Sequence, residues 1–562
     1  MNHAERNSQL ATGVIEVCRA HNVGHVFLSP GSRNTPLMLA LERSKIRTTL
    51  IVDERTASFA ALGWIRARGQ PAALVCTSGS APLHYGPAIA EADAASLPLL
   101  VLSADRPESL RHRGSMQTTL QANLWPELLR ASIDLGTGTP TEDHLVTVDE
   151  ALSCLGSAWP GPVHVNVQFD EPLWSPGNSH EAKVWSPRMR PQRAEVLKHD
   201  LPKAFFNEGA RGLITVGPTF DGQPSHGDSI LNRLCELSQT LGWPILAEYH
   251  SGSRRHKAGV LAFPDLTAFA LDNAESLAPD QILHIGLFPT SKNIQKLLHR
   301  AGTVVHLDPR PGGRLPIGEQ LETLRGDVLA SLASVEVESR DVSTWAQRWF
   351  DADHMISDTM QRLPARSLFE GYVAQQVVAA SRGEPLCVAN SMPIRSVDVW
   401  TGYQPSEVST YVARGVSGID GTLAGAIGVA LAKRSPVWVF LGDLALLHDV
   451  SGLAFARELK VQLRVVVCDN RGGGIFRRLP ISQHETAFES HFLTPQESVN
   501  FEDIARGFGA MTCLVEQSDQ LLASLNAARE AEGVAVVVVK TDSNFDVAEE
   551  ARIRQACGEV LR

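Results

Sequence analysis

Short apolar runs recur along the whole chain, with segments of helical periodicity between them. The runs at residues 72–76 and 465–468 are continuously apolar, so the strands that they predict are buried on both faces. Residues 57–68, in contrast, have the spacing of an amphipathic helix. Continuous apolar strands that alternate with helices are typical of parallel sheets with helices on both sides. The pattern therefore predicts an α/β protein from end to end.

The chain is too long for one hydrophobic core. It has 562 residues, and single cores stop growing at about 250–300 residues. The first group of strands ends in the Pro/Gly/Ser-rich stretch 171–178, and the second fades into the polar stretch 336–343. We expect three doubly wound parallel-sheet domains, which span residues 1–185, 186–355 and 356–562.

The charge and the cysteines exclude several classes of protein. The net charge of −11 argues against a general nucleic-acid or membrane-surface binder, which needs a basic face. The eight cysteines form no CxxC pair, so we expect reduced, buried thiols. No apolar stretch approaches the ~18–20 residues that span a bilayer, and the polar N-terminus lacks a signal-peptide core. We therefore expect a cytoplasmic protein with no nucleic-acid or membrane partner.

The most informative segment is 437–476, where polar residues follow two predicted strands. Asp443 comes directly after the run VWVFLG, and Asn470 ends the run LRVVVCDN, 27 positions later. The carboxyl ends of parallel strands meet at one edge of a sheet, where ligands bind. Mg²⁺ prefers oxygen ligands and commonly bridges carboxylates to phosphates. Asp443, the Asn470 amide oxygen and the Gly472 carbonyl would supply three ligands, and glycines after Asn470 allow a tight turn beside phosphates.

This spacing resembles the diphosphate-binding motif of thiamine-diphosphate enzymes, GDG followed by about 25–30 residues and Asn. Here Leu444 stands in the third position of the motif, after Gly442 and Asp443. The resemblance implies thiamine diphosphate with Mg²⁺ (or Mn²⁺) as cofactors. Taken alone, the Gly-Asp and Asn pair has an equally good structural interpretation, because aspartates at strand ends are common.

Such an enzyme also needs a carboxylate that shares a proton with the aminopyrimidine ring of the cofactor. A carboxyl group in an apolar, water-poor position suits this task, because burial raises its pKa. Glu54 lies at the end of the predicted strand TTLIVDE, just before the helix of residues 57–68. Its alternative role is to charge the first turn of that helix. Combined with the motif near Asp443, the catalytic interpretation is favoured.

Further motifs narrow the resemblance to one family. They are SPGSRNTP at 29–36, SADRP at 103–107, GPVHVNV at 161–167, NSMPIR at 390–395, ARGVSGIDG at 413–421, GDLALLHD at 442–449 and NRGGGIF at 470–476. Together they resemble the 2-succinyl-5-enolpyruvyl-6-hydroxy-3-cyclohexene-1-carboxylate synthases of menaquinone or phylloquinone biosynthesis. The resemblance runs from about residue 10 to the C-terminus and includes Leu444.

The resemblance implies a reaction, in which 2-oxoglutarate is decarboxylated and the resulting succinic-semialdehyde carbanion adds to isochorismate. Two dicarboxylates in an anionic protein need a local set of cations, and arginine binds carboxylates bidentately. The implied substrate contacts are Ser32, Arg33, Arg106, Gln117, Lys292, Arg395, Arg414, Ile475, Phe476 and Leu479. The implied cofactor contacts are Ser391, Ile419, Gly442, Asp443, Leu444, Asn470 and Gly472. Asn293 departs from relatives that carry a basic residue there, so its role is open.

The resemblance also implies an assembly, because in related enzymes the glutamate and the metal site meet across a subunit boundary. We expect a homodimer at least, and a homotetramer by resemblance. The alternatives are another carboligase or decarboxylase of this cofactor class, such as acetolactate synthase, and a non-catalytic protein that keeps the fold. A nucleotide-binding oxidoreductase is disfavoured, since the middle block has no GxGxxG after a strand.

Overall fold

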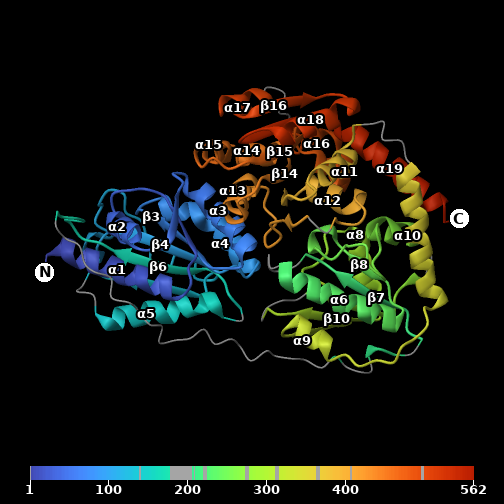
Figure 1. Cartoon of the computed structure of the whole chain (residues 1–562), viewed down its shortest axis with the longest axis horizontal. Coiled ribbons are helices and arrows are strands. Elements are labelled where there is room, and N and C mark those ends of the chain that lie inside the picture. Colours follow the sequence, from blue (N-terminus) through green and yellow to red (C-terminus); the bar gives the residue numbers. More distant parts are fainter. Residues whose placement is uncertain are drawn as a thin grey trace. The chain divides into compact units, whose positions relative to one another are not determined.

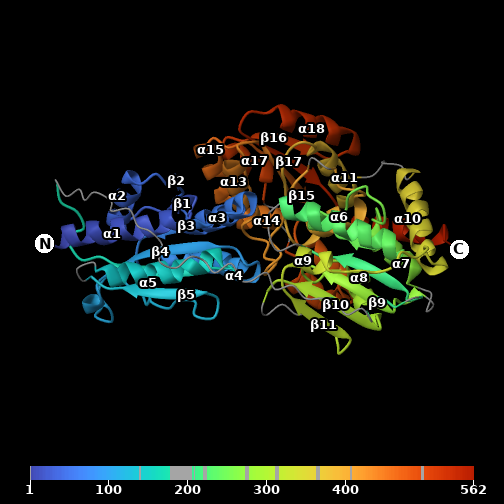
Figure 2. The same ribbon diagram turned by 60° about the horizontal axis from the view of Figure 1, so that its bottom comes forward.

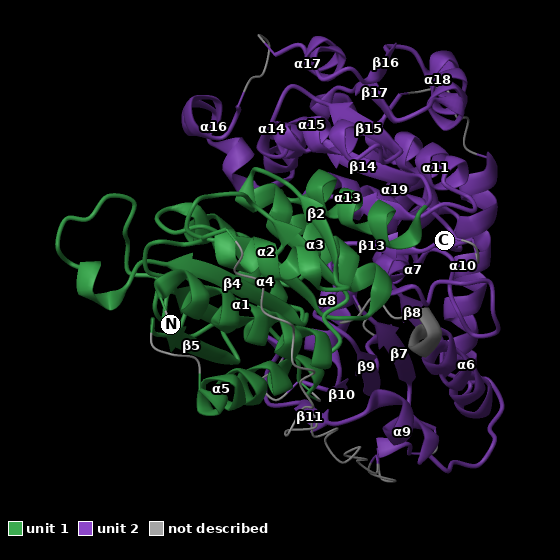
Figure 3. Cartoon of the chain, turned by 60° about the vertical axis from the view of Figure 1, so that its left-hand side comes forward, with its two compact units in different colours: residues 1–195, 413–434 green, residues 196–412, 435–562 purple. Residues whose placement is uncertain are grey.

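The structure is a computed structural model in which three separate sheets are formed. It describes residues 2–137, 141–157, 159–176, 201, 205–207, 209–218, 224–272, 277–310, 315–362, 368–405, 408–494 and 499–561. Every strand pairing in these ranges is parallel. The chain divides into two compact units (Figure 3), one of residues 1–195 with 413–434 and one of residues 196–412 with 435–562.

The first sheet belongs to the first unit and has the strand order β2-β1-β3-β4-β6-β5 (Figure 1). Its strands are β1 (His25–Leu28), β2 (Arg47–Leu50), β3 (Ala72–Cys76), β4 (Leu99–Asp105), β5 (Ala131–Leu135) and β6 (Val163–Gln168). Its helices are α1 (His3–Ala20), α2 (Thr35–Arg43), α3 (Glu54–Arg68), α4 (Gly86–Ala94) and α5 (Glu142–Leu152), with short 3₁₀ turns η1 (Ala81–Tyr85), η2 (Glu108–Leu110) and η3 (Ser153–Gly156). Apolar side chains of α1, α2 and α5 form one core with alternate strand residues such as Val26 and Val75.

Helix α13 (Thr422–Lys433) belongs to the same unit and packs along α3 (Figures 1 and 2). The two helices touch at glycines. A Cβ atom on Gly63 would lie 1.9 Å from the carbonyl oxygen of Gly425, and one on Gly428 would lie 1.9 Å from the carbonyl oxygen of Ala60. This close approach is possible only because these positions carry no side chain.

The middle sheet belongs to the second unit and has the order β11-β10-β9-β7-β8. Its strands are β7 (Gly212–Val216), β8 (Ile245–Ala247), β9 (Gln281–Ile285), β10 (Thr303–Asp308) and β11 (Leu321–Arg325), and its helical segments are α6 (Pro224–Leu241), η5 (Tyr249–Ser251), α7 (Pro264–Leu271), α8 (Lys292–Arg300), α9 (Val328–Ala333) and α10 (Thr344–Arg362). One core cluster contains Ile214 and Val216 with residues of α6 and α9. Another contains Leu213 and Ile282 with residues of α7, α8 and α10, so both faces of the sheet are covered.

The third sheet, also in the second unit, has the order β13-β12-β14-β15-β17-β16. Its strands are β12 (Leu386–Val388), β13 (Thr410–Tyr411), β14 (Val437–Gly442), β15 (Leu463–Asp469), β16 (Met511–Val515) and β17 (Val534–Lys540). Its helical segments are α11 (Glu370–Ala380), α12 (Met392–Trp400), α14 (Asp443–His448), α15 (Ser451–Glu458), η7 (Gly474–Arg478), η8 (Pro480–Gln483), α16 (Glu485–His491), α17 (Phe501–Gly507), α18 (Ser518–Glu530) and α19 (Ser543–Glu559). Numbered within their own sheets, the strands of the first and third sheets follow the same order, 2-1-3-4-6-5.

The predicted α/β class with three parallel-sheet domains is confirmed. The domain boundary expected at residue 185 lies outside the described residues, and both expected boundaries stay predictions. Between β14 and β15 the chain forms two helices, α14 and α15, separated at Asp449 and Val450. All eight cysteines are free thiols, and six are buried as expected, while Cys154 and Cys513 are partly exposed. None of the helices in the described ranges has the length and hydropathy that a membrane span requires.

Candidate functional site

The strand ends of the third sheet bring Asp443 and Asn470 to one edge. Strands β14 and β15 are parallel neighbours with Gly442 opposite Cys468, so the residues that follow both strands emerge on the same side of the sheet. The Asp443 side chain is buried, with 3% of the residue exposed. It accepts hydrogen bonds from the backbone N–H groups of Leu444 and Gly472, both at 2.7 Å. The two halves of the predicted motif are thus in direct contact.

Burial raises the pKa of Asp443 to about 6, against the opposing effect of the Leu444 N–H group. The negative charge of Asp469 raises this pKa further, and the Gly472 N–H group lowers it. A carboxylate in such a position is stabilised by a cation, because the cation offsets the cost of burying the negative charge.

Asn470 and Gly472 complete an arrangement of oxygen atoms that suits a hard divalent cation. In the part of the chain that the structure describes, the Asn470 Oδ1 atom is buried and accepts no hydrogen bond. Gly472 has a φ angle of +94°, and a Cβ atom there would lie 2.0 Å from the carbonyl oxygen of Thr494, so only glycine fits. The described residues hold no group of three or more His, Cys, Asp or Glu side chains that is arranged to hold a metal ion. A carboxylate, an amide oxygen and a backbone carbonyl, completed by phosphate oxygens, fit Mg²⁺ better than Zn²⁺.

Ser391 and Arg395 lie at the start of α12, which follows strand β12 at the same edge of the third sheet. Ser391 has φ 70° and ψ −125°, a strained conformation for a residue with a side chain. Arg395 donates to the Ser391 carbonyl oxygen at 2.5 Å, across the first turn of the helix. Strain of this kind tends to occur at binding sites, so it agrees with the predicted role of Ser391.

The segment with Ile475, Phe476 and Leu479 is held against helix α19. The Arg478 guanidinium donates to the Gly474 carbonyl oxygen at 2.9 Å and forms an ion pair with Glu550 of α19 at 2.6 Å. Arg477 donates to the Ser543 hydroxyl at the start of α19, at 2.6 Å. Both Arg477 and Arg478 therefore bind groups of the protein itself. A cavity of about 870 Å³, lined in part by Asn470 and Gly472, opens beside this segment.

Glu370 and Asp546 form a buried pair of carboxyl groups. This pair predicts that the stability of the protein depends on pH. The Glu370 N–H group donates to Asp546 Oδ1 at 3.0 Å, and the Ser396 hydroxyl donates to Glu370 at 3.2 Å. Burial, followed by the charge of Asp546, raises the pKa of Glu370 from 4.5 to about 8. Burial likewise raises the pKa of Asp546 to about 7. The folded protein therefore keeps protons here that the unfolded chain has released.

The free energy of unfolding should consequently fall as the pH rises from 4.5 to about 8, because the unfolded chain ionises first. Glu370→Gln removes this loss, so we expect the variant to gain on the order of a few kcal/mol over the wild type at pH 8.5 and little at pH 5. Thermal unfolding of both proteins at the two pH values measures the difference. An equal difference at both pH values would contradict the assignment.

Lys292 is the first residue of α8, and its side chain is exposed. Ser291 caps this helix by accepting a hydrogen bond from the Ile294 N–H group at 3.2 Å. The next residue, Asn293, donates to Asp265 Oδ1 of α7 at 3.1 Å. The Asn293 side chain therefore ties α8 to α7. Asn293, whose role the sequence left open, therefore has a structural contact in the protein.

In the first unit, Glu54 is the first residue of α3 and is half-buried. The side chain of Asp53 caps the helix by accepting from the N–H groups of Arg55 and Thr56, at 2.9 and 3.2 Å. The capping task is therefore met by Asp53, which weakens the structural explanation of Glu54. The charge of Glu54 contributes to raising the pKa of Tyr85, after burial and the influence of Cys76, so this carboxylate faces the ends of β3 and η1.

Four predicted substrate contacts gather at the carboxyl edge of the first sheet. Arg106 donates to the Ser78 hydroxyl at 2.6 Å and to the Gln117 carbonyl oxygen at 2.5 Å, and Gln117 donates to the Ser78 carbonyl oxygen at 3.1 Å. Burial and the adjacent guanidinium of Arg33 lower the pKa of Arg106. Arg33, which follows Ser32, also donates to Glu171 at 2.9 Å. Two neighbouring guanidiniums that repel each other favour an anionic ligand between them.

Arg414 and Ile419 also belong to the first unit, in the segment before α13. The Glu91 carboxylate, 1% exposed, accepts from the N–H groups of Gly415 and Val416 at 3.0 and 2.8 Å, and it pairs with Arg66 of α3 at 2.5 Å. Nothing in the sequence marks Glu91 as important. It is a single glutamate in an ordinary helix, and only its contacts show that it holds this segment.

The predicted site residues thus fall into two sets. The first unit contains Ser32, Arg33, Glu54, Arg106, Gln117, Arg414 and Ile419, and the second contains Lys292, Ser391, Arg395, Gly442, Asp443, Leu444, Asn470, Gly472, Ile475, Phe476 and Leu479. Within the second unit, the Asp443, Asn470 and Gly472 group comes together at one strand edge. The individual roles of all these residues stay predictions.

Two stretches of the chain match families of thiamine pyrophosphate (thiamine diphosphate) enzymes. Residues 8–124 match the thiamine pyrophosphate enzyme, N-terminal TPP binding domain, and residues 396–539 match the corresponding C-terminal TPP binding domain. The first stretch contains Glu54, and the second contains Asp443 and Asn470. The chain therefore has both cofactor-binding domains of a thiamine-diphosphate-dependent enzyme.

Curated relatives match nearly the full length of the chain. Proteins named 2-succinyl-5-enolpyruvyl-6-hydroxy-3-cyclohexene-1-carboxylate synthase are similar to it in several organisms. The protein of Acaryochloris marina is 32% identical, with 92% of this chain and 93% of the relative covered. That of Chloroflexus aurantiacus is 34% identical over 90% and 88%, and that of Geobacillus thermodenitrificans is 32% identical over 93% and 92%.

Proposed function

The chain belongs to the 2-succinyl-5-enolpyruvyl-6-hydroxy-3-cyclohexene-1-carboxylate synthase family, and we propose that it makes this compound from 2-oxoglutarate and isochorismate with loss of CO₂. The observation that carries the proposal is the group at the edge of the third sheet. There, the buried carboxylate of Asp443 lies near the side-chain amide oxygen of Asn470, Oδ1, which accepts no hydrogen bond within the described residues. This is the donor set that a divalent cation with a diphosphate requires.

When it is bound, thiamine diphosphate would supply a nucleophilic thiazolium carbon for the 2-oxo group and an acceptor for the electron pair that remains when CO₂ leaves. The protein contributes binding, orientation and proton control. Asp443, Asn470 and the Gly472 carbonyl would hold Mg²⁺ (or Mn²⁺) and through it the diphosphate, with Gly442, Leu444 and Ser391 close by. Ile419 would support the cofactor. Glu54 would hold a proton at the pyrimidine nitrogen N1′ of the cofactor.

The cationic residues would select dicarboxylate substrates. Arg33 and Arg106 are adjacent in the first unit, while Lys292 and Arg395 belong to the second. Acetolactate synthase acts on smaller, less anionic acceptors, which do not require so many cationic residues. The full-length relatives also favour the synthase over this alternative.

A coupled assay tests the proposal. We expect isochorismate to disappear only when 2-oxoglutarate, thiamine diphosphate and Mg²⁺ are all present. Pyruvate in place of 2-oxoglutarate should release little CO₂. Turnover of pyruvate without isochorismate would overturn the proposal and favour a simple decarboxylase or an acetolactate synthase.

Arg106→Lys should raise the KM of at least one of the two acids by about 10–100-fold and change kcat less. Lysine keeps the charge but loses the planar fork, and a hydrogen bond to a charged group contributes about 1.5–3 kcal/mol. Steady-state kinetics with each acid varied in turn measures the effect. Arg348→Lys, at an exposed position of α10, is the control. An unchanged KM for both acids would remove Arg106 from the substrate site.

We also propose an assembly of two or four copies in the cytoplasm. The support is the separation of Glu54 and Asp443 in different compact units, together with the pairing across subunits that the family resemblance implies. Sedimentation of the purified protein at assay concentration tests the assembly. A fully active monomer would contradict it.

A further inference from the structure

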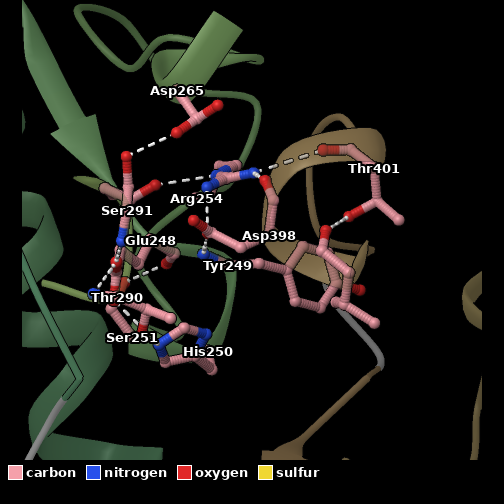
Figure 4. Close-up of polar contacts among 12 residues, drawn as sticks. Glu248, Tyr249, His250, Ser251, Arg254, Asp265, Thr290, Ser291, Asp398 and Thr401 are labelled. Atoms are coloured by element: carbon pink, nitrogen blue, oxygen red, sulfur yellow. Dashed lines mark hydrogen bonds and ion pairs between the residues drawn. The ribbon is translucent and has the colours of Figure 1, made fainter. Parts of the chain in front are cut away.

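A buried polar cluster in the second unit connects two of the segments that carry predicted substrate contacts. It consists of Glu248, His250, Arg254 and Asp398 and is drawn in Figure 4. Glu248 and Arg254 have no exposed surface, Asp398 is 1% exposed and His250 is 5% exposed. Burying four ionisable groups is costly unless each is paired, so their retention in the core needs an explanation.

One half of the cluster holds the turn before Lys292. Glu248 comes directly after β8, at the carboxyl edge of the middle sheet. Its Oε1 atom accepts hydrogen bonds from the N–H groups of Thr290 and Ser291, the latter at 2.9 Å, and its Oε2 atom pairs with His250 Nε2 at 2.8 Å. The Ser291 hydroxyl is in turn held by Asp265 at 2.6 Å. The backbone just before Lys292 is thus fixed, although the Lys292 side chain itself is exposed.

The other half holds the C-terminal end of α12. The Arg254 guanidinium donates to the carbonyl oxygens of Asp398 and Thr401, at 2.5 and 3.2 Å, and pairs with the Asp398 carboxylate. A cation at the last carbonyls of a helix satisfies unpaired acceptors and interacts favourably with the helix dipole. Asp398 also accepts from the Tyr249 N–H group at 2.8 Å, one residue after Glu248. Helix α12 carries Ser391 and Arg395 at its other end.

We propose that Glu248 and Arg254 are positioning residues, which hold Lys292 and Arg395 at fixed places in one dicarboxylate-binding site. Glu248 and Arg254 are only six positions apart in the chain. A shift of the backbone at one of them therefore moves the other. Two cations from different sheets bind a dicarboxylate more tightly if both are held in place before the ligand arrives, because less ordering is needed on binding. This inference rests on the proposed function, since it takes Lys292 and Arg395 to be substrate contacts.

The test compares Glu248→Ala with Glu248→Gln. Alanine leaves the Thr290 and Ser291 N–H groups without their acceptor, whereas glutamine keeps an oxygen for them. We expect Glu248→Ala to raise the KM of one dicarboxylate about tenfold, with kcat within threefold of wild type, and Glu248→Gln to restore the KM to within threefold. Glu236→Gln, at an exposed position of α6, is the matched control. A fall in kcat with an unchanged KM would overturn the proposal, because it would indicate a general structural effect.

A double-mutant cycle shows whether Glu248 acts through Lys292. In a Lys292→Ala background, Glu248→Ala should change the KM no further, and an undiminished tenfold effect there would overturn the proposal. The same comparison for Arg254→Lys uses an Arg395→Ala background, with the same expectation. In both cycles, substitution of the positioning residue should change the KM only if the cationic residue that it positions is present.

Hydrogen exchange separates this inference from the proposed function. The amides of Thr290 and Ser291 should exchange faster in Glu248→Ala than in wild type, and Glu248→Gln should restore their protection. This readout needs no turnover. A wild-type protein that is inactive with both acids would therefore remove the proposed function alone, while unchanged exchange in Glu248→Ala would remove the inference alone.

Discussion

Glu54→Gln should bind thiamine diphosphate as tightly as the wild type and lose about 10²–10⁴-fold in kcat, the range that a positioned acid or base contributes. Glutamine keeps the size of the side chain and can form a hydrogen bond, but it cannot share a proton with the pyrimidine nitrogen. Because Asp53 caps α3, the substitution should leave the fold intact. Cofactor titration by fluorescence and steady-state turnover measure the two quantities separately.

The control for this variant is Glu42→Gln, at an exposed position of α2, which should behave as wild type. An independent readout is the exchange of the thiazolium C2 proton of the bound cofactor with solvent deuterium. That exchange should slow in Glu54→Gln by a factor similar to the loss in kcat. Near-wild-type turnover would show that another carboxylate activates the cofactor.

Asp443→Ala should weaken the binding of thiamine diphosphate in the presence of Mg²⁺ by about 100-fold or more. Loss of groups that only support metal ligands costs 10–100-fold, so loss of a ligand should cost at least as much. Asn470→Ala should behave in the same way, because it removes the buried Oδ1 atom that accepts no hydrogen bond in the described structure. Cofactor titrations at several Mg²⁺ concentrations measure the effect.

A chelator gives the complementary experiment. EDTA should release the cofactor from wild type and have little further effect on Asp443→Ala, whose metal-dependent binding is already lost. Asp503→Asn, at an exposed position of α17, is the control. If Asp443→Ala binds the cofactor as wild type does and remains sensitive to EDTA, the metal lies elsewhere.

The central strands were predictable from the sequence, and most of the edge strands were not. β3 is buried at every position and its sequence is a continuous apolar run, and β15, also fully buried, has the apolar run 465–468 at its centre. β5, β11 and β16 are edge strands with one or more exposed residues, and their sequences contain polar residues that hide the pattern. The same strand order in the first and third sheets was likewise invisible, since periodicity identifies strands but not their neighbours.

The chemistry proposed for the chain can be recognised from short motifs in its sequence. Asp443, Asn470 and the glycines after it can be recognised because they lie at strand ends, and local sequence predicts where strands end. The family motifs then indicated the arginines. These motifs are short, contiguous stretches of sequence, so they can be identified without knowing which segments of the chain are in contact in the fold.

The residues that hold these groups in place can be identified only from the contacts in the folded protein. Glu91, Glu248 and Arg254 bind backbone groups that are 7 to 325 positions away in the chain. A backbone N–H or carbonyl group is present at every position, so the sequence cannot show which ones a buried charge will satisfy. That choice is made when the packed core excludes water and leaves each buried charge to find its partner within the protein.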